Sequence, residues 1–161
     1  MLLRPSETAV IVTSLFFSMS LSIVALPDQV SQAMPNLTLL TLIYWCISLP
    51  HKVSVGTGWL TGLFVDILTG SLMGQNALIF SLTAYLSHHA YPRLKHYTLW
   101  QQSAFILFFL ITSQLFTLWL RKLGGHFEAT YLFWISTLSG ALFWPILSTT
   151  LSFIRRHYRL A

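Results

Sequence analysis

The pattern of hydrophobic and polar positions divides the chain into six long apolar segments joined by short polar stretches. The segments cover residues 8–26, 35–49, 53–70, 76–87, 99–120 and 131–154. In a bilayer the protein must satisfy its own backbone hydrogen bonds, and these runs are too long and too uniformly apolar to be barrel strands. We therefore predict an all-α polytopic membrane protein, a bundle of six transmembrane helices in a single membrane domain over residues 1–161.

Two of these segments allow another interpretation. As a helix, segment 35–49 reaches only about 22 Å, short of a hydrocarbon core about 30 Å thick. It therefore needs flanking polar residues, a locally thinner bilayer or a place inside the bundle, and a re-entrant hairpin of segments 35–49 and 53–70 is the alternative. Segment 8–26 follows a basic start, as a signal peptide does, but it is long enough to span a bilayer and no clear cleavage site follows it. We interpret it as an uncleaved first span.

The composition agrees with a membrane protein and excludes several other classes. Hydrophobic residues make up 55% of the chain and charged residues 8%, against about 25% charged residues in a typical soluble domain. The net charge of +5 does not indicate nucleic-acid binding, because the basic residues are scattered between the apolar segments. Cys46 is the only cysteine, which excludes an internal disulfide and a cysteine-based zinc cluster.

The basic residues predict the orientation in the membrane. Six spans with the N-terminus inside leave only Arg121 and Lys122 on the outer side. The inner side then holds Arg4, Lys52, Arg93, Lys95, Arg155, Arg156 and Arg159. This partition follows the positive-inside rule, so we predict that both termini are cytoplasmic. The basic loop residues His51, Lys52, Arg93 and Lys95 are expected to meet anionic lipid headgroups or a protein partner.

One stripe of the third segment combines glycines with an acid in an otherwise apolar stretch. Gly58, Gly62, Asp66 and Gly70 are each four residues apart, which places them along one face of a helix. Small residues at this spacing let a second helix approach closely. A carboxylate facing lipid would be costly, so Asp66 must face protein or a wet cavity. We predict that these four residues form a helix-packing or partner seam.

Asp66 has a structural and a functional interpretation. It either fixes helix packing through hydrogen bonds or binds a substrate or a coupling proton, and we favour the structural role. Polar residues at a similar depth are its candidate partners, namely Asn36, Gln75, Asn76 and Gln114. No serine lies beside a credible base, and no acid or cysteine completes a site with the adjacent His88 and His89. We therefore expect no enzyme activity, no metal and no cofactor.

The residues of the third segment and its surroundings also carry a family resemblance. The block "MPNLTLLTLIYWCISLPHKVSVGTGWLTGLFVDILTGS" at 34–71 closely resembles the MreD family of rod shape-determining proteins of the bacterial inner membrane. The matching positions are Pro35-Asn36, Tyr44-Trp45, Leu49-Pro50-His51, Val55-Gly56-Thr57-Gly58, Gly62, Asp66 and Gly70. "LWQQ" at 99–102 and "FWISTLSGALFWP" at 133–145 extend the resemblance, which covers about residues 27–155.

The resemblance implies a function that the residues alone do not give. MreD-like proteins belong to the elongation machinery that inserts side-wall peptidoglycan and keeps cells rod-shaped. They partner with MreC and, through it, with MreB, RodA and a penicillin-binding transpeptidase. Their fold resembles the six-helix substrate-binding S components of energy-coupling-factor transporters, an analogy of fold alone.

We therefore favour a non-enzymatic membrane scaffold that binds an MreC-like partner. If the glycine seam receives that partner, Gly62→Leu should reduce co-purification of the partner and leave membrane insertion intact. The alternative is a small-molecule-binding subunit of a membrane transporter, with Asp66, Asn36 and Asn76 lining an outward cavity.

Overall fold

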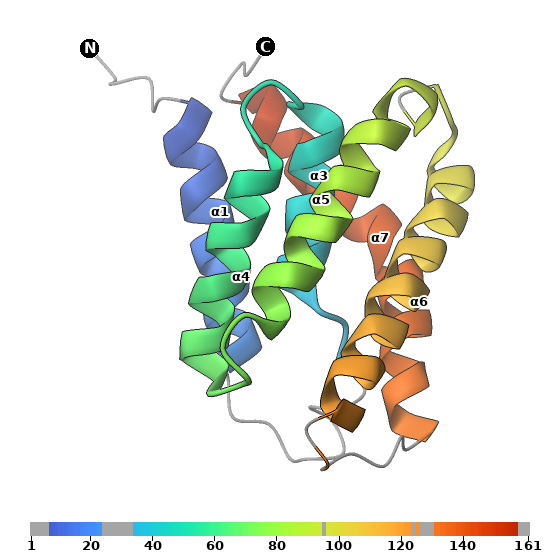
Figure 1. Ribbon diagram of the computed structural model, residues 1–161. Helices are drawn as coiled ribbons and strands as arrows, with labels where there is room; N and C mark the ends of the chain where they lie inside the picture. The colour runs from blue at the N-terminus through green and yellow to red at the C-terminus, as the bar shows by residue number, and fades with distance from the viewer. Residues whose placement is uncertain (1–6, 24–33, 95, 124, 126–130, 158–161) are drawn as a thin grey trace.

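The computed structural model describes residues 7–23, 34–94, 96–123, 125 and 131–157, and the regular structure within them is helical (Figure 1). The helices are α1 (Glu7–Ile23), α3 (Leu37–Ser48), α4 (Val55–Thr69), α5 (Gln75–Leu94), α6 (Leu99–Leu123) and α7 (Tyr131–His157). The prediction of an all-α chain is confirmed for this part of the sequence. A single membrane domain crossed by all six helices stays a prediction.

The helices differ from the predicted segments mainly at their polar ends. α5 continues to Leu94 and α7 to His157, beyond the predicted ends at 87 and 154. The apolar pattern stopped too early because a helix can continue with polar side chains once it leaves an apolar environment. α1 is described to Ile23, so residues 24–26 of the first predicted segment lie outside the described residues.

The short helix α3 is the centre of the molecule. All of its residues from Thr38 to Cys46 are buried. It packs against α1, α5 and α7, whereas α4 packs chiefly against α5 and α6 chiefly against α7. Trp45 in its last turn is fully buried and donates a hydrogen bond from Nε1 to Ser14 Oγ of α1 at 2.8 Å. The short segment 35–49 is therefore accommodated inside the bundle, one of the alternatives expected from its length.

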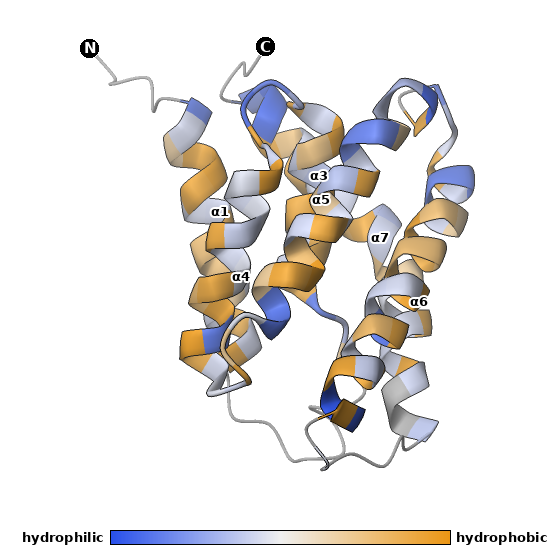
Figure 2. Cartoon of the chain, in the orientation of Figure 1, coloured by the Kyte–Doolittle hydropathy of each residue, from blue (hydrophilic) through white to orange (hydrophobic). Residues whose placement is uncertain are grey.

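Large apolar side chains cover the outside of the bundle, and several polar side chains are buried inside it among the apolar core residues. Phe16 and Phe64 are 68% and 59% exposed, while Thr41 and Asp66 are buried. In water such an apolar exterior would be a severe liability, but in a bilayer it is required. Among the described residues, two helices are long and apolar enough to cross a membrane, α6 and the Trp134–His157 part of α7. Figure 2 shows that hydrophobic residues dominate the middle of the helices.

The described basic residues are divided unequally between the two ends of the bundle. The start of α1, the α3–α4 and α5–α6 turns and the end of α7 lie at one end of the molecule (Figure 1). We call this the basic end, because it carries Lys52, Arg93, Arg155 and Arg156. Arg121 and Lys122 lie in the last turn of α6, at the opposite end. Arg4, Lys95 and Arg159 lie outside the described residues. The cytoplasmic position of the basic end stays a prediction.

Candidate functional site

Asp66 lies one turn before the end of α4 and is 2% exposed. Its carboxylate accepts five hydrogen bonds, all from residues that follow α4 in the chain. Oδ1 accepts from Ser71 Oγ at 2.6 Å and from the backbone N–H and the side-chain Nδ2 of Asn76, both at 3.0 Å. Oδ2 accepts from the backbone N–H of Gly74 at 2.9 Å and of Ala77 at 3.3 Å. The acid is therefore fully engaged by the chain itself.

These hydrogen bonds cap the N-terminus of α5. The first N–H groups of a helix have no partner within the helix, and a carboxylate there also meets the positive end of the helix dipole. Asp66 accepts from Gly74, Asn76 and Ala77, and the N–H of Gln75 donates to the carbonyl of Leu72 at 2.9 Å. Asp66 thus joins the end of α4 to the start of α5 across the turn between them.

Gly58 and Gly62 bring α4 and α5 into backbone contact. A Cβ atom on Gly62 would lie within 2.5 Å of the Asn76 carbonyl and the Ala77 backbone, and one on Gly58 would lie 2.8 Å from the Phe80 carbonyl. Only glycine leaves enough space at either position. Since α5 occupies this face of α4, the close approach at Gly58 and Gly62 occurs within the chain, as in the helix-packing form of the predicted seam. Binding of a partner by the seam stays a prediction.

Gly70 does not belong to the α4–α5 contact. It follows the last residue of α4, and a Cβ atom there would meet nothing within 4 Å. Its backbone is left-handed, with φ of 62°, and its N–H donates to the Asp66 carbonyl. Gly70 therefore ends the helix through its backbone conformation.

The structure brings one predicted partner to Asp66 and places the others elsewhere. Asn76 binds the carboxylate through both its backbone and its side chain. Asn36 instead caps α3, accepting the N–H of Leu39 at 3.1 Å. Gln114 lines a cavity of about 40 Å³ together with Asn36, Asn76 and the buried Thr137, whose Oγ1 has no partner. Gln75 is buried in the first turn of α5.

Sequence reasoning missed Ser71 and the backbone donors of Gly74 and Ala77. Ser71 makes the shortest contact with Asp66 and also accepts from Asn76 Nδ2 at 3.2 Å. The available signal was a serine directly after the glycine that ends α4. A backbone N–H carries no mark in the sequence, so the amide donors could be found only from the fold.

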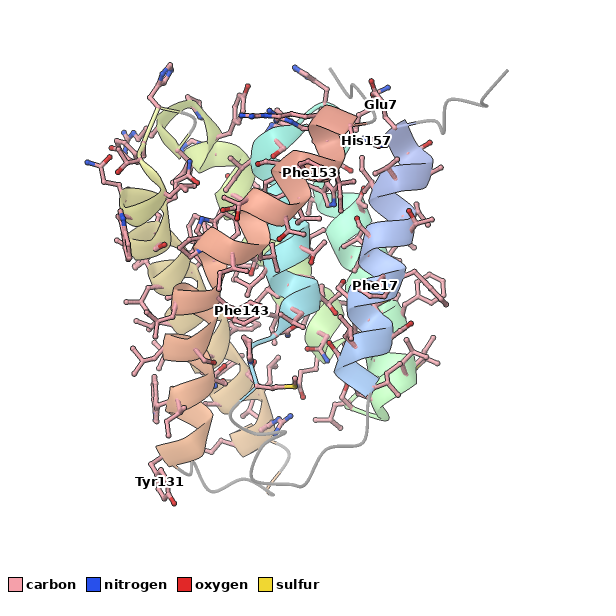
Figure 3. The ribbon with its side chains drawn as sticks, turned by 180° about the vertical axis from the view of Figure 1, so that it is seen from behind. Glu7, Phe17, Tyr131, Phe143, Phe153 and His157 are labelled. Atoms are coloured by element: carbon pink, nitrogen blue, oxygen red, sulfur yellow. The ribbon has the colours of Figure 1, made fainter. Side chains whose placement is uncertain are left out.

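A second feature that the sequence did not suggest is an apolar groove between α1 and α7. Its volume is about 730 Å³, and α3 forms its floor. Phe17 of α1 and Phe143 of α7 lie on its two sides (Figure 3). Small side chains line the α1 side, among them Ala9 and Thr13, and the Thr13 hydroxyl donates to the carbonyl of Ala9 at 2.8 Å. We call this the α1–α7 groove.

The predicted basic loop is exposed where it is described. His51 and Lys52 lie on the α3–α4 turn, and Arg93 lies in the last turn of α5. Lys52 Nζ lies 3.6 Å from Glu7 Oε2, which ties this turn to the start of α1. Lys95 lies outside the described residues. Among the residues that the structure describes, no three His, Cys, Asp or Glu side chains gather in a way that could hold a metal ion.

Comparisons with known proteins point to one family. The family model described as rod shape-determining protein MreD matches residues 4–154. The chain is also similar to the rod shape-determining protein MreD of Haemophilus influenzae, with 30% identity over 78% of this chain and 78% of that protein. No solved structure matches the chain. The likeness to transporter S components therefore stays a prediction.

Proposed function

The chain belongs to the MreD family of rod shape-determining proteins, and we propose that it serves rod-shape determination as a non-enzymatic membrane scaffold. In this proposal its six helices span the bacterial inner membrane with both termini in the cytoplasm. It binds an MreC-like partner and supports side-wall peptidoglycan synthesis in an elongation complex with MreB, RodA and a penicillin-binding transpeptidase.

The observation that carries this proposal is the α1–α7 groove. Helices in a bilayer associate through close packing, because lipid tails are as apolar as the side chains they would replace. The α1 side of the groove, from Ala9 to Leu21, is about 18 Å long at about 1.5 Å per residue. That length is more than half of a hydrocarbon core about 30 Å thick. The groove therefore fits a transmembrane helix of the partner.

The polar side chains in the groove are compatible with binding of an apolar helix. Thr13, Ser18 and Thr150 each donate a hydrogen bond from the hydroxyl to a carbonyl of their own helix. Their hydroxyl groups are thereby satisfied and the side chains present small surfaces that a second backbone can approach. Asp66 supports the non-enzymatic part of the proposal, because its five hydrogen bonds leave this membrane-embedded acid without a free role.

Neighbouring positions on α1 provide the test. Thr13 lines the groove, whereas Val12 is 62% exposed and does not line it. We expect Thr13→Phe to fill the groove and reduce co-purification of the MreC-like partner about tenfold, the effect of losing roughly 1.4 kcal/mol of binding free energy. Val12→Phe adds the same ring to the same helix and should leave co-purification unchanged.

Both variants should reach the membrane at wild-type levels, which is checked by fractionation. Normal partner recovery with Thr13→Phe would contradict docking in the groove. Rod cells depleted of the native protein should become round and should recover with the wild-type chain but not with Thr13→Phe. Recovery with Thr13→Phe would argue against a scaffold that works through this groove.

A pocket at the end opposite the basic end favours a second candidate function, a small-molecule-binding transporter subunit. Its volume is about 530 Å³, within the usual range for ligand pockets, and Asn36, Asn76 and Arg121 contribute to its walls. Thermal unfolding of the purified chain with a panel of small metabolites tests this function. A stabilising ligand whose effect is lost in Asn36→Ser, which keeps an N-cap residue for α3, would favour it. A panel without any stabilising compound would count against it.

A further inference from the structure

A second pocket opens at the basic end, between α3, the α3–α4 turn and α7, with α5 and α6 contributing to its rim. Its volume is about 760 Å³. The walls combine cationic and hydroxyl-bearing side chains with apolar ones such as Ile47 and Leu99. It is separate from the α1–α7 groove, and the scaffold function makes no use of it. We call it the basic-end pocket.

The charged residues of the pocket are all basic. Lys52, Arg155 and His51 line it, and no acidic residue is among its described lining residues. Arg155 is half-buried and has neither an ion pair nor a hydrogen bond within the described part of the chain. Lys52 is 50% exposed, and its contact with Glu7 is long, at 3.6 Å. An anion entering the pocket would therefore meet cationic groups that the described part of the chain leaves largely uncompensated.

Polar groups continue from the mouth of the pocket into its interior along α7. Ser152, Ser148 and Trp144 follow Arg155 at intervals of three to four residues and line the same pocket. Ser152 Oγ is hydrogen-bonded to the Tyr44 hydroxyl at 3.0 Å. Trp144 is 1% exposed, and its Nε1–H has no acceptor among the described residues.

The unpaired indole of Trp144 indicates a missing acceptor. Buried polar groups normally have a hydrogen-bond partner, and leaving a donor unpaired costs about 1–3 kcal/mol. The other fully buried tryptophan, Trp45, does have one, because its Nε1 donates to Ser14. Nothing in the described chain fills this role for Trp144, so a bound molecule with acceptor oxygens would complete the site.

From these contacts we propose that the basic-end pocket binds the phosphate headgroup of an anionic lipid. The Arg155 guanidinium pairs with the phosphate, since its planar set of donors fits phosphate oxygens, and Lys52 adds a second charge. Acceptor oxygens below the phosphate reach the Ser152 hydroxyl and the Trp144 N–H. Apolar walls and a mouth at the helix ends suit a lipid, and basic pockets between membrane helices are known places for anionic headgroups.

Adjacent arginines make a matched test. Arg155 lines the pocket, whereas Arg156 is exposed and does not line it. The full chain is purified in detergent and titrated with phosphatidylglycerol or with zwitterionic phosphatidylcholine, and bound lipid is counted by native mass spectrometry. Arg155→Gln should weaken phosphatidylglycerol binding about tenfold, as expected for one hydrogen bond to a charged group. Arg156→Gln should change it less than about twofold, because exposed charges contribute little.

Two further measurements test the role of the Trp144 indole and whether the bound phosphate belongs to a lipid or is free. Trp144→Phe keeps an aromatic ring, loses the N–H, and should weaken phosphatidylglycerol binding about threefold. It also supplies the test if Arg155→Gln fails to fold. Inorganic phosphate in large excess should not displace the lipid. Equal binding of phosphatidylcholine, equal losses in Arg155→Gln and Arg156→Gln, or displacement by inorganic phosphate would each overturn the proposal.

Discussion

At the scale of single residues, Asp66 shows how an acid is accommodated inside an apolar bundle. The transfer of an unpaired carboxylate into an apolar environment is very costly, and hydrogen bonds to the charged group offset that cost. Here five donors meet two oxygens, and three of the donors are backbone N–H groups that would otherwise lack a partner. The same contacts therefore satisfy the acid and the start of α5 together.

Replacing Asp66 tests this mutual dependence. In Asp66→Asn one acceptor oxygen becomes an NH₂ group that faces the N–H donors of the α5 cap. We expect the free energy of unfolding in detergent to fall by about 1–3 kcal/mol, the cost of leaving buried donors unpaired. Thermal unfolding followed by gel filtration measures the change.

Glu7→Gln is the control for that variant, because it alters a partly exposed acid in an ion pair at the basic end. Exposed ion pairs contribute about 0–1 kcal/mol, so this variant should stay close to wild type. Equal stability of Asp66→Asn and Glu7→Gln would contradict the capping role of Asp66.

Gly70 gives a second prediction at the residue scale. Its φ of 62° is strained for any residue with a Cβ atom, although a Cβ there would meet no other group. Gly70→Ala should therefore destabilise the protein by about 1–2 kcal/mol through backbone strain alone. Gly70→Asn should be milder, since asparagine tolerates left-handed backbone better, and the order of the two melting temperatures checks this expectation. A milder effect for alanine than for asparagine would be inconsistent with a backbone cause.

At the scale of the elements, the backbones of α4 and α5 lie in direct contact. Close approach needs glycine at Gly58 and Gly62, and the Asp66 cap fixes the register at one end of the pair. Gly56 lies on the same helix, yet a Cβ atom there would lie 3.6 Å from its nearest neighbour, Ser54 Oγ. Helix α4 thus contains two glycines that pack tightly against α5, Gly58 and Gly62, and one that has room for a Cβ atom, Gly56.

This difference leads to a prediction about helix packing. Gly62→Ala should destabilise the fold by about 1–3 kcal/mol, because the added methyl group overlaps the backbone of α5. Gly56→Ala should remain within about 1 kcal/mol of wild type, since alanine is the better helix former and has room. Unfolding of both purified variants in detergent measures the difference, and equal stabilities would argue against close α4–α5 contact. If Gly62→Leu reduces partner co-purification, we expect the cause to be disruption of this internal packing.

The elements also show how far the sequence could lead. Apolar segments marked the helices, and the four-residue spacing of Gly58, Gly62 and Asp66 indicated a packing face, because side-chain spacing follows helix geometry. The sequence could not show which helix packs on that face, since a helix of the same chain and a helix of a partner require the same small residues. The α1–α7 groove was invisible for a different reason. It depends on which helices are neighbours in space, and residues of α1 and α7 are far apart in the sequence.

At the scale of the whole molecule, the two ends differ in charge and the middle is apolar. Lys52, Arg155 and Arg156 lie at the basic end, and Arg121 and Lys122 lie at the other. Such an asymmetry orients a membrane protein with its more basic side in the cytoplasm. α6 begins at the basic end and finishes at the opposite one (Figure 1), so its two ends can report which side of the membrane each end of the bundle occupies.

Cysteine labelling measures this orientation directly. The native Cys46 is fully buried, so the wild-type chain should react little with a membrane-impermeant maleimide and serves as the background. A cysteine replacing Leu123, which is 70% exposed at the far end of α6, should be labelled from the periplasm of cells with a permeabilised outer membrane. A cysteine replacing the exposed His51 should react only after the inner membrane is disrupted, because we expect the basic end in the cytoplasm. Labelling of both positions from the same side would contradict a membrane-spanning α6, and the reverse pattern would place the basic-end pocket in the periplasmic leaflet.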